Sequence, residues 1–384
     1  MTAASLPLWL ALAAAGAAVP PAALPGHVPE RGSVEDELRY AMDRAERELR
    51  EHPLRVRDAA LEAYVHDVAC RVAGEYCGEL RVYVIEQPWF NASMAPNGML
   101  VVWTGALLRC RDEAELAMVL GHEFAHFRQR HSLVQWRKAK RTSAFLGTFG
   151  LVAWGAGAAA AGPAASLLGA ASMYGHSREA EREADAIGLA AAVAQGYEAA
   201  AAPRLWQRMK AEEDARRHGK PLPVFATHPR TAERLADVTA AAARLPAGGE
   251  SGRDRHQAAV APHFARWLRG ELSRRMYDSS ARVIGDLLAD APPARQSLLS
   301  YYLSEAHRRR GGPGDAARAA ELLARSLALP DPPAEAWRDH GLALRDAGHH
   351  EEASASLRRY LALSPEADDA EFIASYLASP EPGR

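Results

Sequence analysis

The sequence predicts a mainly α fold with a small β-sheet, followed by a second region of paired helices. Apolar residues recur at helical spacing over most of the chain, and two short Val-rich runs bounded by Pro and Gly are typical of strands. Beyond residue 257, bulky, small and turn-forming residues follow the spacing of a tetratricopeptide repeat.

The composition is that of an ordinary globular protein. The 384 residues are 48% hydrophobic and 24% charged, with a formal net charge of -2. A chain of this length can form two domains, one of them with a sizeable core. The nearly balanced charge gives no reason to expect a nucleic-acid partner, and no glycine-rich phosphate-binding loop is apparent.

The N-terminus predicts export. An apolar run from Leu6 to Val19 is followed by Pro20, so residues 1–25 are predicted to form a signal peptide. The basic residues usual before such a run are missing, and a buried or unstructured apolar terminus is the alternative. No cysteine closely follows the run, so a lipid anchor is not expected.

The three cysteines are compatible with an exported protein. Cys70 and Cys77 can close a small loop, and Cys110 is left over. Three buried thiols are an equal alternative. The spacing of the thiols fits no zinc knuckle.

Secondary structure is predicted as follows. Helical patterning runs from Asp36 through Arg71. Two strands follow, Leu80–Ile85 and Met99–Trp103, and the chain is then helical to about Arg244.

A turn-rich segment that is nearly free of apolar residues begins at Leu245 and ends at Gly252. It predicts a first domain over residues 35–244, a linker over 245–256 and a second, repeat-containing domain over 257–384.

The run Gly121-His122-Glu123-Phe124-Ala125-His126 places two histidines four residues apart. On a helix these imidazoles share one face, so both can bind one metal ion while Glu123 lies beside a metal-bound water. Asp112 can cap the first turn of that helix, and Glu115 is the expected capping-box partner.

A third ligand is needed, since this short motif also arises by chance. The segment Ser177–Asp185 supplies it on a second predicted helix, where Glu181 and Asp185 share a face one turn apart. Two histidines and a glutamate leave a fourth position open, the arrangement of catalytic zinc. Zinc lowers the pKa of bound water to about 7, and Glu123 would accept the water proton and pass it to the leaving amine.

Several motifs in order resemble one known family over about residues 35–240. The motifs are Asn91–Gly98, Met99–Gly105, His122–His126 with Arg130-His131, Ser177-Arg178 with Glu181 and Asp185, and Thr227-His228-Pro229 with Arg234. They resemble the gluzincin metallopeptidases that include the HtpX heat-shock peptidase and the CAAX prenyl protease. With the C-terminal repeats, the closest architecture is the periplasmic BepA-like type.

The resemblance implies one Zn2+ per chain, bound by His122, His126 and Glu181, with Asp185 holding a ligand histidine by its outer N–H. The family pattern selects Glu181 over its neighbours, and Glu179, Arg182 and Glu183 are expected on a solvated helix face. His131 is expected to be structural or to support the ligands.

The resemblance also places His228 in the active site, where the equivalent histidine can occupy the fourth zinc position and hold the enzyme latent. A helix-start turn with a solvated His228 is the alternative. Asn91 and Ala92 resemble positions that border the substrate groove. If Met99–Trp103 forms the edge strand beside the cleft, an extended peptide can add to it by main-chain hydrogen bonds.

The Ala- and Gly-rich segment 144–174 follows a basic run at Arg137–Arg141. It predicts a buried helical pair or a membrane-associated hairpin without a full span, because Ala and Gly provide little transfer free energy. Peripheral membrane contact is therefore one expectation for this segment.

The repeat pattern is clearest in one copy. Its residues are Trp337, Gly341, Leu344, Gly348, Ala353, Leu357 and Pro365. Residues 319–329 and 277–292 suggest more degenerate copies, and an unrelated helical bundle is the alternative.

Together these features predict a periplasmic or secreted zinc metalloendopeptidase that hydrolyses unfolded or misassembled envelope proteins. The repeats would recruit a substrate or a protein partner. The alternative is a chaperone-like tetratricopeptide binding protein in which proteolysis is latent or minor. An intact Glu123 favours the enzyme, since a pure adaptor needs no general base.

Overall fold

The computed structural model describes residues 20–141, 176–216, 228 and 232–378. The apolar run 6–19 and the segment 144–174 lie outside these residues, as do Thr227 and Pro229. The described part is mainly helical with one three-stranded sheet, as predicted. None of its helices combines the length and the apolar content needed to cross a membrane.

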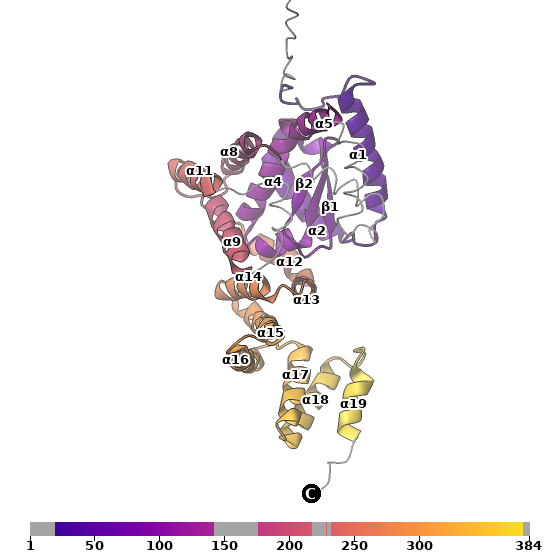
Figure 1. Ribbon diagram of the computed structural model, residues 1–384, viewed down its shortest axis with the longest axis vertical. Coiled ribbons are helices and arrows are strands. Elements are labelled where there is room, and N and C mark those ends of the chain that lie inside the picture. The colour runs from indigo at the N-terminus through magenta and orange to yellow at the C-terminus, as the bar shows by residue number, and fades with distance from the viewer. Residues whose placement is uncertain (1–19, 142–175, 217–227, 229–231, 379–384) are drawn as a thin grey trace, which may run out of the picture.

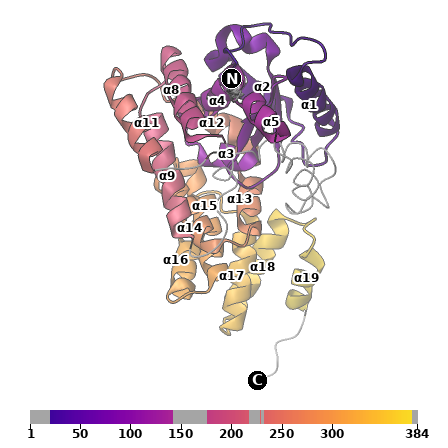
Figure 2. The same cartoon turned by 45° about the horizontal axis from the view of Figure 1, so that its top comes forward.

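The first part of the chain carries the sheet. Its elements are α1 (Val34–Arg50), α2 (Ala59–Ala73), the 3-10 helix η1 (Gly74–Glu79), β1 (Arg81–Ile85), β2 (Ala92–Met94), β3 (Met99–Trp103), α3 (Thr104–Arg109), α4 (Glu113–Arg128), α5 (His131–Arg141), α8 (Arg178–Ala194), α9 (Ala201–Ala215) and α11 (Ala232–Arg244). Figure 2 shows α8, α9 and α11 together on one side of α4, with α1 on the other.

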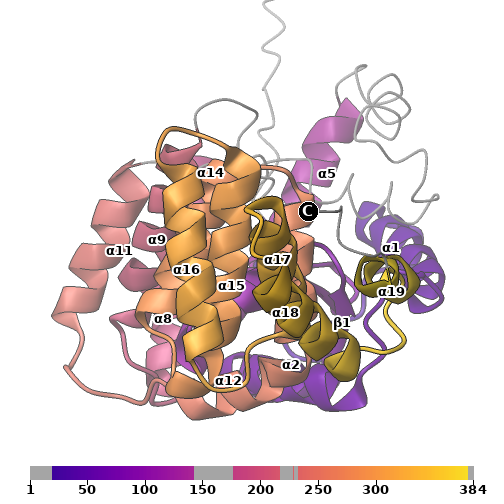
Figure 3. The same cartoon turned by 90° about the horizontal axis from the view of Figure 1, so that it is seen from below.

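The second part is wholly helical where it is described. Its elements are α12 (Arg253–Val260), η3 (Ala261–His263), α13 (Phe264–Ser273), α14 (Tyr277–Ala289), α15 (Pro293–Arg310), α16 (Asp315–Ala328), α17 (Ala334–Asp346), α18 (His350–Leu363) and α19 (Ala370–Ala378). Figure 1 shows these helices below the sheet, and in Figure 3 α16, α15, α17 and α18 lie side by side.

The strand order is β1-β3-β2, with β1 parallel and β2 antiparallel to β3. The expectation that Met99–Trp103 forms an edge strand is therefore wrong. It is the central strand, because the short strand β2, which the sequence patterns did not reveal, pairs with its outer side. The edge nearer to α4 is β2.

Both faces of the sheet are covered, which explains why β3 is apolar at consecutive positions. Met99 and Val101 pack against α1 and α5, whereas Leu100 and Val102 belong to the larger cluster that includes α2 and α4. On the α1 side, Glu46 accepts hydrogen bonds from Arg81 at 2.7 Å and from Tyr83 at 2.8 Å.

Two local expectations are settled by the structure. The helical stretch predicted from Asp36 to Arg71 is two helices, because the chain turns between α1 and α2 around Pro53. Cys70 and Cys77 form a disulfide between α2 and η1, and Cys110 is a buried thiol.

The large hydrophobic cluster continues from the sheet region into α13–α16. Trp267 and Leu268 of α13 are 3% and 0% exposed within it. A buried ion network lies beside them: Arg109 of α3 donates to Glu212 of α9 at 2.7 and 2.8 Å and to Glu271 of α13 at 2.8 Å. This network fixes α9 between α3 and the C-terminal helices.

Five of the seven predicted repeat residues fall on α17 and α18, whereas Gly348 lies between these helices and Pro365 follows α18. A Cβ atom at Gly341 would lie 2.7 Å from Cδ2 of Leu357, so the glycine permits close packing of the two helices. Tetratricopeptide repeats use this kind of packing, and the repeat assignment remains a prediction.

Helices α4 and α8 cross in direct backbone contact. A Cβ atom at Gly188 would lie 2.7 Å from the backbone N of His122, and one at Gly121 would lie 3.0 Å from the carbonyl O of Gly188. No side chain fits between the helices there. The contact therefore sets the distance between the His122-Glu123 segment and the side chains of α8.

We expect Gly188→Ala to push α8 away from α4 and to lower the free energy of unfolding by about 1–3 kcal/mol, as overpacking does. The matched control is Gly285→Ala in α14, where no heavy atom lies within 4 Å of an added Cβ. Gly285→Ala should raise the free energy of unfolding by up to about 1 kcal/mol, because alanine has a higher helix propensity than glycine. Denaturant unfolding measures both, and a Gly188→Ala protein as stable as the wild type would contradict the close-contact interpretation.

Candidate metal centre

Helix α4 positions the two histidines and Glu123. The predicted N-cap is confirmed, since the Asp112 side chain accepts from the N–H of Glu115 at 2.9 Å. The Glu115 carboxylate accepts from the N–H of Arg111 at 2.9 Å rather than from the N-cap residue itself. All three predicted functional residues of α4 are buried, with 2–9% exposure.

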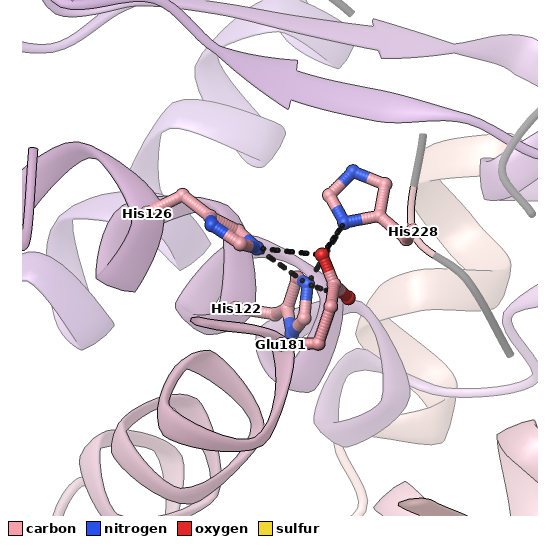
Figure 4. A group of neighbouring side chains, drawn as sticks. All are labelled: His122, His126, Glu181 and His228. Carbon is pink, nitrogen blue, oxygen red and sulfur yellow. Dashed lines mark hydrogen bonds and ion pairs between the residues drawn. The ribbon is translucent and has the colours of Figure 1, made fainter. Parts of the chain in front are cut away.

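Four possible metal ligands converge between α4, α8 and the segment that contains His228 (Figure 4). Nε2 of His122 lies 3.0 Å from Nε2 of His126 and 3.2 Å from Nδ1 of His228. Oε1 of Glu181 lies 3.0 Å from Nδ1 of His228 and 3.5 Å from Nε2 of His126.

These separations fit a tetrahedral metal site. Ligands about 2.0–2.1 Å from zinc in tetrahedral geometry lie about 3.3 Å from one another. Imidazole nitrogens that face each other this closely repel through their lone pairs unless a cation or a proton lies between them. The donor set, three imidazoles and a carboxylate, is one that binds divalent transition metals.

The buried charges also fit a divalent cation. Glu123, Glu181 and Asp185 are 0–7% exposed in their side chains, and among the described residues Arg234 is the cation that contacts Glu181 and Asp185. Counted over the described residues, three ionised carboxylates and one guanidinium leave two negative charges, which a divalent ion would balance. Buried charges are rarely left unpaired, because desolvation is unfavourable.

Asp185 and Arg234 contact the ligand residues His122 and Glu181 and orient them. Oδ1 of Asp185 lies 3.0 Å from Nδ1 of His122, and Arg234 donates to both Asp185 oxygens at 2.8 Å. Nη1 of Arg234 lies 2.6 Å from Oε2 of Glu181, which leaves Oε1 directed at the histidines. Asp185 thus contacts the ring nitrogen of His122 that does not face the other ligand atoms.

The pKa shifts follow from these contacts. Burial acts to raise the pKa of Asp185, but the hydrogen bond to His122 and the contact with Arg234 outweigh it and lower that pKa. Burial acts to lower the pKa of His122, but Asp185 raises it. Burial together with the neighbouring histidines lowers the pKa of His126 well below the ordinary value.

His126 is held by a second chain of contacts. Its Nδ1 lies 2.8 Å from Nδ1 of His131, whose Nε2 lies 3.3 Å from Oε2 of Glu183. If Nε2 of His126 binds metal, its Nδ1 must carry the proton and donate to His131, which then donates to Glu183. Glu183, expected on a solvated face, is half-exposed but also supports the site.

Glu123 lies beside the ligands without joining them. Its Oε1 is 3.7 Å from Nε2 of His228, and the backbone N–H of Met94 in β2 donates to its carboxylate. Burial raises the pKa of Glu123, and this outweighs the opposite effect of His228 and His122. Such a raised pKa is typical of a carboxylate that accepts and returns protons.

Asn91 and Ala92 lie at the start of β2 and are 5% and 3% exposed. The carbonyl O of Asn91 accepts from the N–H of Trp103, and Ala92 pairs with Val102. Their backbone thus builds the edge of the sheet, which approaches α4 through Met94 and Glu123.

Sequence reasoning missed three parts of this centre. Arg234 was noticed only as a motif residue, and the link from His131 to Glu183 was not foreseen. His176 stacks on His126 with ring centroids 3.9 Å apart, and burial lowers its pKa to about 3. The recurrence of histidines around the zinc motif was the available signal for His131 and His176.

Comparison with known proteins finds similarity over the region that contains the centre. Residues 55–242 match the model of peptidase family M48. The mitochondrial metalloendopeptidase OMA1 of Schizosaccharomyces pombe is 34% identical over 159 residues, which are 41% of this chain and 45% of that protein. The beta-barrel assembly-enhancing protease of Escherichia coli is 29% identical over 202 residues, 50% of this chain and 41% of that protein. The chain thus spans less than half the length of these curated relatives.

We expect Asp185→Asn to weaken binding of a divalent metal by about 10–100-fold, because the neutral amide orients His122 less strongly and releases Arg234. The matched control is Asp237→Asn on α11, whose side chain is 57% exposed and contacts Arg182. Competition with a chelating dye measures both affinities. Equal affinity in the Asp185→Asn protein and the wild type would show that this carboxylate does not support a metal ligand.

Proposed function

We propose that this chain, whose residues 55–242 match the model of peptidase family M48, is a zinc metalloendopeptidase. Its substrates would be unfolded or misassembled envelope proteins. The observation that carries this proposal is a buried glutamate, Glu123, beside four converging ligand atoms. The envelope substrate is supported by the predicted export signal and by the name of the Escherichia coli relative, a beta-barrel assembly-enhancing protease.

His122, His126 and Glu181 would hold the zinc ion. When bound, zinc lowers the pKa of water to about 7 and polarises the substrate carbonyl. Asp185 and His131 keep the outer nitrogens of the two histidines protonated, so that their Nε2 lone pairs face the cluster. Arg234 contacts Oε2 of Glu181, so that Oε1 faces the histidines.

Glu123 would act as the general base. Its carboxylate accepts a proton from water as the water oxygen bonds to the peptide carbon, and the raised pKa favours this transfer. The Glu123 carboxylate then delivers that proton to the amine as the C–N bond breaks. The Met94 N–H keeps the carboxylate in position between these two transfers.

The substrate backbone would lie along the β2 edge, with Asn91 and Ala92 bordering it. Support comes from the position of β2 at the edge of the sheet, next to α4 and Glu123. An extended segment added there must be locally unfolded, since it exchanges its own backbone hydrogen bonds for those of the sheet.

His228 would keep the enzyme latent. Its Nδ1 lies among the ligand atoms, where it can take the fourth position that a water molecule needs. A closed set of four protein ligands is typical of structural zinc, whereas catalytic zinc keeps one position open. Activation would then require His228 to move away.

Export to the periplasm and recruitment of substrates or a protein partner through α12–α19 also belong to this proposal. A chaperone-like role with minor proteolysis is the alternative, and the latent arrangement of His228 is the observation that favours it. Function that persists in cells carrying a Glu123→Gln chain would support this alternative.

We expect Glu123→Gln to abolish hydrolysis of an unfolded protein such as casein, by about 100-fold or more, while zinc content stays unchanged. The reason is that glutamine preserves shape but cannot accept the water proton. Chelation should also abolish wild-type hydrolysis, and added zinc should restore it. Mass spectrometry of casein fragments and metal analysis give both readouts. Activity that persists in the variant would rule out Glu123 as the base.

We expect His228→Ala to raise hydrolysis of the same substrate. If the closed form makes up about nine-tenths of the molecules, its loss corresponds to about a tenfold rise in kcat/KM. The control is His307→Ala on α15, a partly buried histidine that pairs with Asp315 far from the centre in the chain. Lower activity in His228→Ala, with zinc still bound, would instead show that His228 assists the reaction.

A further inference from the structure

A second pocket lies where the first part of the chain meets the C-terminal helices. Its volume is about 390 Å³ with the open mouth included, and none of its lining residues belongs to the metal centre. The wall is formed by α3, α12 and α13 and by the residues around the turn between α14 and α15. Its apolar lining residues are Leu107, Leu108, Val260, Phe264, Leu287, Ala291, Pro292 and Leu299.

The charged residues of this pocket are mostly basic. Arg111, Arg253 and Arg295 line it, whereas the carboxylate that lines it is Asp290. His256 also lines the pocket, and burial lowers its pKa to about 4, so this side chain is neutral near pH 7. The wall therefore carries an excess of positive charge. We propose that the pocket binds an organic anion, whose carboxylate or phosphate head group pairs with the arginines and whose body is apolar.

Arg295 lacks a counter-ion among the described residues. Its guanidinium donates to the carbonyl O of Gln257 and lies 4.4 Å from the centre of the Phe264 ring. Burial lowers the pKa of Arg295, and no carboxylate of the described residues forms an ion pair that would raise it. A partly buried cation of this kind gains from an anion, which its guanidinium can bind through two parallel hydrogen bonds.

The charge of Arg111 is only partly balanced. Its side chain is 8% exposed, and Nη1 lies 3.3 Å from Oδ2 of Asp290, a carboxylate that is 53% exposed. Burial and the neighbouring Arg208 lower the pKa of Arg111 to about 10 in spite of Asp290. A half-exposed carboxylate compensates a buried guanidinium incompletely, because water screens the pair. An anion in the pocket would therefore lie near two guanidinium groups that lack full compensation.

Two further features favour an anion with an apolar body. Pro292, the N-cap residue of α15, lines the pocket, so the positive end of an 18-residue helix lies at its wall. An inorganic anion would leave the apolar lining in contact with water, whereas an apolar group gains free energy from burial there. Because Leu107 of α3 and Leu299 of α15 both line the pocket, the ligand would contact both parts of the chain and stabilise their junction.

The first experiment follows thermal unfolding of the full chain with hexanoate, hexyl phosphate, hexanol or inorganic phosphate at equal concentration and ionic strength. We expect one of the two hexyl anions to raise the unfolding midpoint by about 2 °C or more, because it binds the folded chain. Hexanol and inorganic phosphate should each produce less than about half of that shift. The anion with the larger shift identifies the head group. Shifts as large with hexanol as with both hexyl anions would overturn the proposal, since the arginines would then contribute nothing.

The second experiment removes one charge from the pocket. Arg295→Gln should weaken binding of the preferred hexyl anion by about tenfold or more, because a charge-assisted hydrogen bond is lost. The matched control is Arg318→Gln on α16, which removes the same charge from an arginine that is 46% exposed, contacts Glu321 and lies outside the pocket. Isothermal titration calorimetry measures both affinities, and the control should change less than about twofold. Equal affinity in the Arg295→Gln protein and the wild type would contradict the proposed site.

A third variant tests the apolar part of the pocket. Ala291 is partly buried in the turn between α14 and α15, so the indole of Ala291→Trp should fill the pocket and abolish binding of the anion. Unchanged binding to this variant would show that the anion binds elsewhere. Circular dichroism identifies a misfolded variant. If Arg295→Gln misfolds, Ala291→Trp decides, and if both misfold, the comparison of the hexyl anions with hexanol in the wild type decides.

Discussion

The backbone contact between Gly121 and Gly188 is the constraint on which the rest of the centre depends. Because no side chain separates α4 from α8 at this crossing, the two histidines of one helix lie within reach of Glu181 and Asp185 of the other. The other residues of the site contact side chains of these two helices. Arg234 bridges the two carboxylates of α8, and the link from His131 to Glu183 spans α8 and the start of α5.

The close crossing also creates an electrostatic requirement. It brings three carboxylates and several imidazoles into a volume from which water is largely excluded, and such a group is stable only if its charges are balanced and its polar atoms paired. Asp185, Arg234 and His131 each satisfy part of this requirement. The remaining negative charge fits a divalent cation. The interactions that stabilise the fold here are therefore the same ones that would tune a metal ion for hydrolysis.

The C-terminal helices are joined to this centre through α9. One hydrophobic cluster runs from the sheet region through α13 to α16, and the ion network of Arg109, Glu212 and Glu271 lies within the same interface. Because α9 lines a pocket beside Glu123 on one side and packs against α14 on the other, its position depends on both parts of the chain.

The sequence by itself determined the helical class, β1 and β3 within one residue and the N-cap of α4, and it predicted the reacting groups on α4 and α8. These features are local: they follow from periodicity, capping and residues one helical turn apart, which fix a shared face before any tertiary contact forms. Only the tertiary structure decided which strand lies at the edge, because strand order depends on pairing between distant segments and β2 is too short for a clear pattern. It also decided that Cys70 bonds to Cys77, that Glu183 supports His131, and that His228 joins the ligand cluster. Each of these depends on the distance between segments far apart in the chain or on the turn that joins two elements, and spacing along the sequence does not specify such distances.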